Sequence, residues 1–199
     1  QGIRERGRAE LGGVDGLAML KRTLAYQRPV TTLDTKLADG SLDLDGIAGR
    51  IEENLFYGIY PGAWVRAENE DHQTEPTWST EAKRAVFARF TPLFRRLAAA
   101  GWEPVTDART DDSGVWVERY GSAADGDLHL ALRNHTGRER DVTLEVDLRA
   151  QPLGEESRVE ELLTGAEVRP DRAGDVLFLT VSVPADSTRL LAFTDPSAR

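Results

Sequence analysis

The sequence contains no cysteine, one methionine and three histidines. Without cysteine the chain can form no disulfide, carry no thiolate nucleophile and build no cysteine zinc site. The three histidines, His72, His129 and His135, are widely spaced, so the chain offers few residues for a histidine metal cluster or a Ser-His-Asp triad. The sequence therefore predicts no metal site and no cofactor.

Long apolar runs and an excess of basic residues are also missing. No run approaches the roughly 18 apolar residues that a transmembrane helix needs. The 25 Lys and Arg are outnumbered by 34 Asp and Glu, which gives a formal net charge of -9. Because nucleic acids and anionic membrane surfaces require a basic face, we expect neither as a partner. The lack of cysteine leaves the localisation open, including a secreted or cell-surface one.

The first half of the chain is organised around residues 55–64, which read LFYGIYPGAW. This short apolar run is closed by Pro61 and Gly62 and leads into a polar loop at residues 65–79. Such a run is typical of a buried parallel strand with a functional loop at its carboxyl end. We therefore expect a strand over residues 56–60.

Helical and extended patterns alternate around this run. Apolar residues at helical spacing predict a helix over residues 14–27, which must stop before Pro29, and a strand then ends at Asp34. Ser41 or Asp43 can cap a second helix, which begins near Leu44 and has Ile47 and Ile51 in its buried stripe. Residues 3–13 suggest the remnant of a helix and a turn. The order predicts α/β units with short connections.

A third helix is predicted between Thr80, a capping residue, and Gly101, a typical helix terminator. Pro92 falls inside its apolar pattern and should kink or split it. Beyond about residue 107 the period of the pattern changes from helical to two. Strands are expected over residues 115–120, 128–134, 142–148, 158–163, 176–183 and 188–193.

These strands are separated by turn dipeptides such as Asp125-Gly126 and Thr164-Gly165, a pattern typical of an antiparallel sandwich. We place the boundary within residues 108–114, with an α/β domain over residues 1–110 and an all-β domain over residues 111–199. His129 alternates with Leu128 and Leu130, so it should face solvent. Asn134-His135-Thr136 matches the glycosylation acceptor pattern, but it occupies the hairpin connection, and we interpret it as a turn.

Two groups of phrases resemble a known family. MLKRTLAYQRPVTTLDT, ENLFYGIYPGAW and FTPLFRRLAAAGWEPVTDA look like the last part of the TIM barrel of bacterial glycoside hydrolases. LHLALRNHTGRERDVTLEVDL and ELLTGAEV resemble the C-terminal β-sandwich of alpha-amylase-like and alpha-galactosidase-like enzymes. The resemblance covers nearly the whole chain from Met19. It implies the last strand–helix units of a (β/α)8 barrel plus an antiparallel β-sandwich.

This resemblance also limits what the chain can do by itself. Glycosidases need two carboxylates that flank the scissile bond, and in the families resembled these lie on middle strands of the barrel. The catalytic residues are therefore expected upstream of Gln1 and cannot be named in this chain. We expect the chain alone to be inactive, with a carbohydrate as substrate and the rest of its own barrel as partner.

The candidate substrate-binding residues follow the predicted strands. Asp34 stands at a strand end, where a barrel places functional groups, although the sequence favours the alternative that it caps a helix or turn. Tyr60 and Trp64 flank the next turn and could stack on a sugar ring or pack at the rim. Further contacts could come from the following loop, through Glu68, Asp71 and His72, although a loop this rich in charge is more often simply solvated.

Two other interpretations remain open. A carbohydrate-binding or structural module would show a row of exposed aromatic residues on one sheet face. The sandwich offers Trp116, Tyr120, Phe178 and Phe193, which are spread over three expected strands and lie mostly in core register, so the sequence disfavours this interpretation. A degenerate barrel that has lost catalysis would differ from an enzyme only in its upstream carboxylates.

Overall fold

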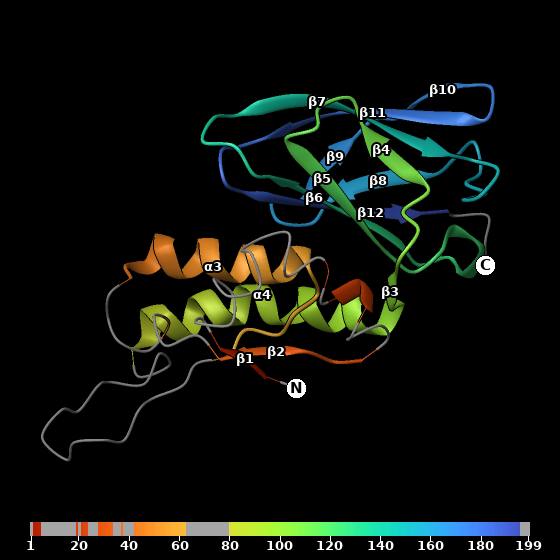
Figure 1. Ribbon diagram of the computed structural model, residues 1–199. Helices are drawn as coiled ribbons and strands as arrows, with labels where there is room; N and C mark the ends of the chain where they lie inside the picture. Colours follow the sequence, from red (N-terminus) through yellow and green to blue (C-terminus); the bar gives the residue numbers. More distant parts are fainter. Residues whose placement is uncertain are drawn as a thin grey trace, which may run out of the picture. The chain divides into compact units, whose positions relative to one another are not determined.

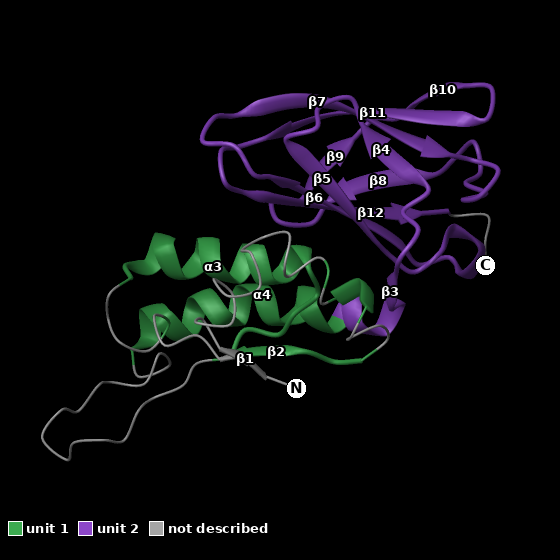
Figure 2. Cartoon of the chain, viewed as in Figure 1, with its two compact units in different colours: residues 1–95 green, residues 96–199 purple. Residues whose placement is uncertain are grey.

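The computed structural model describes residues 2–4, 19, 21–23, 28–33, 37, 42–62 and 80–195. The chain divides into two compact units, residues 1–95 and residues 96–199 (Figure 2). The first unit combines helices with short parallel strands, and the second consists mainly of antiparallel sheet (Figure 1). Among the residues that the structure describes, no helix is both long and apolar enough to cross a membrane.

In unit 1, three chain segments run parallel to one another. Strand β1 (Gly2–Arg4) pairs in parallel with β2 (Thr31–Leu33), and Thr31 forms a parallel bridge with Tyr60. Two backbone hydrogen bonds of 2.9 Å hold the third segment, one from Tyr60 N to Val30 O and one from Thr32 N to Tyr60 O. Helical residues 19 and 21–23 fall between β1 and β2 in the sequence, and helix α3 falls between β2 and Tyr60. The order is thus strand, helix, strand, helix, strand.

The expected strand over residues 56–60 is wrong except at Tyr60. Helix α3 (Leu44–Phe56) takes in the start of the apolar run, and Ile59 N donates to Asn54 O at 2.9 Å to close the helix end. Phe56 and Tyr57 are completely buried. The run is therefore apolar because the end of a helix is buried there. Residues 2–4 also differ from expectation, because they form β1 rather than the remnant of a helix.

Both long helices begin where the sequence predicts. The Asp43 side chain accepts a hydrogen bond of 2.8 Å from Gly46 N at the start of α3. Helix α4 (Glu81–Ala100) begins after Thr80, whose hydroxyl accepts from Lys83 N at 3.2 Å, and it ends at Gly101, where φ is +82°. The predicted split at Pro92 does not occur, since α4 is helical throughout. Pro92 removes a single donor from the helix, because its ring nitrogen carries no hydrogen.

Unit 2 contains two antiparallel sheets. The order is β3-β5-β6-β12-β8-β9 in the six-stranded sheet and β10-β11-β7-β4 in the four-stranded sheet. All six predicted strands are confirmed, and their bounds agree to within two residues: β5 (Val115–Tyr120), β6 (Leu128–Asn134), β7 (Arg140–Asp147), β8 (Arg158–Glu161), β11 (Val176–Val183) and β12 (Thr188–Thr194). The pattern missed four short strands: β3 (Trp102–Glu103), β4 (Ala108–Thr110), β9 (Ala166–Val168) and β10 (Asp171–Ala173).

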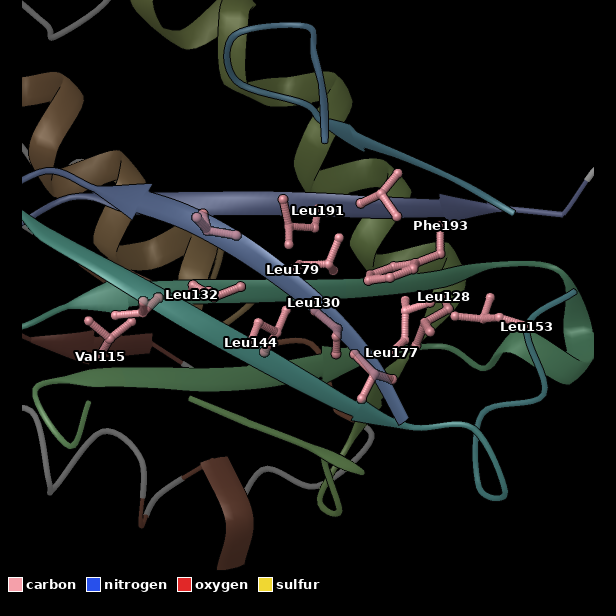
Figure 3. Packing of buried hydrophobic residues seen from close by; sticks show 14 of the residues in the cluster. Val115, Leu128, Leu130, Leu132, Leu144, Leu153, Leu177, Leu179, Leu191 and Phe193 are labelled. Carbon is pink, nitrogen blue, oxygen red and sulfur yellow. The ribbon is translucent and has the colours of Figure 1, made fainter. Parts of the chain in front are cut away.

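The core of unit 2 lies between the two sheets (Figure 3). Leu130 of β6, Leu144 of β7 and Leu191 of β12 have no exposed surface, and Leu179 of β11 has almost none. Burying one such side chain completely contributes about 1.5–3 kcal/mol. The core thus explains why the period-two pattern of the sequence is strong on these strands.

The boundary expected within residues 108–114 does not coincide with the division between the two units, which falls between Arg95 and Arg96. Residues 108–110 form β4, which pairs with β7 in the four-stranded sheet. The start of the segment that the sequence predicts as a domain boundary is therefore an edge strand of the sandwich.

Asn134 joins the end of β6 to the hairpin that follows. Its side chain is completely buried, and Nδ2 lies 2.8 Å from Arg138 O and 2.9 Å from Val183 O. Its Oδ1 accepts from the Thr136 backbone N–H at 2.8 Å and from the Thr136 hydroxyl at 2.6 Å. In the folded chain this asparagine is a turn residue with no free amide to modify, in agreement with the turn interpretation.

Replacing Asn134 with alanine should lower the free energy of unfolding by roughly 1–3 kcal/mol, because buried carbonyl and amide groups lose their partner. Urea unfolding followed by tryptophan fluorescence measures this loss. The control is Thr136→Ser, which keeps the hydroxyl and should stay within about 0.5 kcal/mol of the wild type. Equal stability of N134A and wild type would show that the network does not stabilise the fold.

Candidate functional site

The carboxyl ends of the parallel segments in unit 1 lie at one edge. Strand β2 ends at Leu33, and the third segment continues from Tyr60 into Pro61 and Gly62. Since parallel strands point the same way, the carboxyl ends of both segments face the same edge. This edge, which we call the strand-end site, is where the sequence predicts substrate-binding groups.

Hydroxyl and amide groups hold the two segments together at the strand-end site. The Thr31 hydroxyl donates to Tyr60 O at 3.0 Å. The Thr32 hydroxyl accepts from the Asn54 side chain at 3.3 Å and from Gly62 N at 3.4 Å. A Cβ on Gly62 would lie only 2.2 Å from Thr32 O. The chain passes so close to β2 at this point that it requires glycine.

Of the predicted substrate-binding residues, the structure describes Tyr60 alone. Its partly buried ring stacks against Phe94 of α4, with ring centroids 5.6 Å apart and planes inclined at 30°. This contact shows that the Tyr60 ring packs against α4, and stacking of the ring on a sugar stays a prediction. Asp34 follows β2 directly in the sequence, but it lies outside the described residues, as do Trp64, Glu68, Asp71 and His72.

Sequence reasoning missed Asn54, a buried amide on α3. Its side chain is 2% exposed, and Oδ1 has no hydrogen-bond partner within the part of the chain that the structure describes. The sequence does contain a signal for this buried amide, because Asn54 falls at the spacing of the buried stripe formed by Ile47 and Ile51. A polar residue in that stripe must bond to the neighbouring strand, which Asn54 does through Thr32.

A second set of buried polar groups lies on the six-stranded sheet, on the face that points away from the core of unit 2. Trp102 Nε1 donates to Glu118 Oε2 at 2.8 Å, and the Arg133 side chain donates to the Thr188 hydroxyl at 3.1 Å. All seven residues of β6 are buried, so both faces of this strand are out of water. The expectation that His129 faces solvent is therefore wrong, since its side chain is 1% exposed.

His129 has an environment that disfavours its charged form. Neither ring nitrogen makes a hydrogen bond among the described residues, and Nδ1 lies 3.5 Å from Asp127 Oδ1. Burial lowers the pKa of His129 below its usual 6.5, and the positive charge of Arg96 lowers it further, whereas Asp127 opposes both effects. The described residues contain no group of three or more His, Cys, Asp or Glu that could hold a metal ion.

No protein-family model and no curated protein sequence matches this chain. Solved structures do match it. A candidate alpha-galactosidase from Bacteroides fragilis is similar over 92% of this chain and 38% of its own, with 9% identity and a TM-score of 0.52. An Anoxybacillus alpha-amylase is similar over 75% of this chain and 33% of its own, with 15% identity and a TM-score of 0.48.

A GH30 endoxylanase from Clostridium papyrosolvens is similar over 83% of this chain and 41% of its own, with 12% identity and a TM-score of 0.44. The chain therefore spans well under half the length of each of these proteins. Its likeness to the Bacteroides protein shows that it shares the fold of part of that protein.

Acidification should destabilise the protein through His129. Because the folded pKa is lowered, only the unfolded chain takes up this proton as the pH falls below about 6.5, and the free energy of unfolding falls by at most about 1.4 kcal/mol per pH unit. Urea unfolding at a series of pH values between about 7.5 and 5 measures the slope. His129→Leu should remove this contribution to the slope.

Asp127→Asn serves as a second variant for the same measurement. Asp127 raises the pKa of His129, so its removal should extend the loss of stability to lower pH. An unchanged slope in H129L would show that the proton uptake comes from another group.

Gly62→Ala should destabilise unit 1 by roughly 1–3 kcal/mol, because the new methyl group collides with the Thr32 carbonyl. Hydrogen exchange at the Thr32 and Tyr60 amides, which bond the two segments, should become faster. Gly49→Ala is the matched control, since a Cβ there meets nothing within 4 Å on α3 and should stabilise the helix by about 0.5–1 kcal/mol. Unchanged exchange in G62A would contradict the close approach.

Proposed function

We propose that this chain is the C-terminal part of a TIM-barrel glycoside hydrolase, in which the strand-end site forms one wall of the substrate cleft. Unit 1 would supply the last strand–helix units of the barrel, and unit 2 the sandwich that follows it. The intact enzyme would hydrolyse or transfer an O-glycosidic bond of a carbohydrate. Its catalytic carboxylates would come from the rest of the barrel.

The observation that carries this proposal is the parallel arrangement in unit 1. β1, β2 and Tyr60 lie side by side in chain order, and helical segments fall between them in the sequence. Consecutive parallel neighbours joined by helices are the repeating unit of a (β/α)8 barrel, whose functional groups follow the carboxyl ends of the strands. The likeness to the Bacteroides protein over most of the chain supports the same assignment.

In this arrangement the predicted residues have distinct roles. Asp34, the first residue after β2, would accept hydrogen bonds from sugar hydroxyl groups. Trp64, two residues beyond Gly62, would offer an aromatic face to the apolar side of a sugar ring. Glu68, Asp71 and His72 would add contacts from the loop that follows. Tyr60 would position this wall through its contact with Phe94.

Hydrolysis of aryl glycosides by the natural full-length gene product tests the proposal. Asp34→Asn should lower kcat/KM by about 10- to 100-fold, because a hydrogen bond to a charged group is worth about 1.5–3 kcal/mol. Asp45→Asn is the matched control, since Asp45 is exposed in the first turn of α3 and should leave kcat/KM unchanged.

Two results would contradict the proposal. If the full-length protein hydrolyses neither α- nor β-linked aryl glycosides, it is not a glycosidase, and the result favours the interpretation as a degenerate barrel. If D34N and D45N have the same activity as the wild type, Asp34 has no part in the substrate cleft. Circular dichroism of each variant separates loss of activity from loss of fold.

A further inference from the structure

Unit 2 contains a pocket of about 400 Å³ at the edge of the four-stranded sheet, which we call the edge pocket. One wall is the segment that leads into β4, including Val105 and Asp107, and the floor is the outer face of β4, β7 and β11. On that face Glu145 of β7 pairs in register with Arg109 of β4 on one side and with Phe178 of β11 on the other. A volume of this size suits a small ligand.

Phe178 corrects an expectation from the sequence. It alternates along β11 with Leu177 and Leu179, which belong to the core, so it lies on the opposite face and is only partly buried. The expectation that the aromatic residues of the sandwich lie mostly in core register therefore does not hold for Phe178. An aromatic ring thus stands next to Glu145, one of the residues that line the edge pocket.

The wall of the edge pocket is held in place from behind by Arg119. Its Nε donates to Val105 O at 2.7 Å, and one terminal nitrogen lies 3.5 Å from Asp107 Oδ2. The same Asp107 oxygen accepts from Gln151 Nε2 at 2.8 Å, and Asp107 O accepts from Asp147 N at 2.9 Å. A wall fixed by this many bonds exists before any ligand arrives, which lowers the entropic cost of binding.

The charges in the edge pocket are nearly balanced. Three carboxylates and two guanidinium groups line it, and each carboxylate has an arginine beside it. Arg109 lies 2.6 Å from Glu145, and Arg149 bonds to Asp147, whose pKa is lowered by those hydrogen bonds, first from the side chain and then from the backbone N–H. Such a lining offers neither the free carboxylates that a cation needs nor the excess positive charge that an anion needs.

We propose that the edge pocket binds one unit of a neutral saccharide. A sugar hydroxyl both donates and accepts, so it can bridge the carboxylate and the guanidinium of one ion pair without displacing either. The C–H face of the ring would lie against Val105, which is 62% exposed, and Val176. The choice of a saccharide over other neutral polyols rests on the proposed function, and the pocket would be a second site that holds carbohydrate near the enzyme.

Titration of the isotopically labelled chain with maltose and with methyl α-galactopyranoside, followed by amide NMR, tests the proposal. We expect shifts at residues 105–109 and 145–149 with a Kd on the order of 1 mM for one of the two sugars. Glu145→Gln and Arg149→Gln should each weaken binding about tenfold, as the loss of one charged hydrogen bond predicts. Glu167→Gln on β9, an exposed glutamate of the other sheet, should bind like the wild type.

Three results would overturn the proposal: no shifts with either sugar, shifts confined to other residues, or equal binding by wild type and both pocket variants. Larger shifts at the pocket with inorganic phosphate than with sugar would do the same. Arg149 is largely exposed, so R149Q keeps the test valid if E145Q fails to fold.

Hydrolysis separates this proposal from the proposed function. In the full-length enzyme, E145Q should hydrolyse a small aryl glycoside as fast as the wild type while it binds sugar at the pocket about tenfold more weakly. If the full-length protein binds sugar at the pocket but hydrolyses no glycoside, the proposed function fails and the pocket stands. If it hydrolyses glycosides but sugar causes no shifts at the pocket, the proposed function stands and the proposed pocket fails.

Discussion

The burial of both faces of strand β6, in the middle of the six-stranded sheet, is the constraint on which much of unit 2 depends. One face of the sheet carries the leucines and valines of the core, and the other carries Glu118, His129 and Arg133, which are also out of water. A buried polar group costs free energy unless it finds a partner. Trp102 and Thr188 supply partners for Glu118 and Arg133 through hydrogen bonds. For His129 the same burial favours the neutral ring and lowers the pKa of the side chain.

This constraint also explains where the sequence predicted the fold and where it did not. The six longer strands of unit 2 alternate in a period of two because one face of each packs into the core, and their bounds were close to correct. The same alternation gave a wrong orientation to His129, because a polar residue opposite a core face need not be in solvent when that second face is buried. The four missed strands have only two or three residues, too few to show any period.

Capping chemistry is local and was predicted well. Asp43, Thr80 and Gly101 are each recognisable from a few neighbouring residues, and each bounds a helix as expected. The candidate sites differ in how far neighbouring residues reveal them. The sequence could suggest Asp34 as a candidate because this residue directly follows a strand pattern. The edge pocket instead joins residues 105–109 to residues 145–149 through antiparallel pairing, which no local pattern encodes. Asn54 lies between these cases, since its position in an apolar stripe was visible and its partner Thr32 was not.

The four short strands have a further consequence. They are the outermost strands of both sheets, and each exposes only two or three residues of backbone along its free edge. Charged residues mark these edges, among them Arg109 on β4, Glu167 on β9 and Arg172 on β10. Another chain that approached to extend either sheet would find a brief ladder of hydrogen bonds beside repelling charge. The outermost strands of the sandwich thus offer little backbone for such an extension.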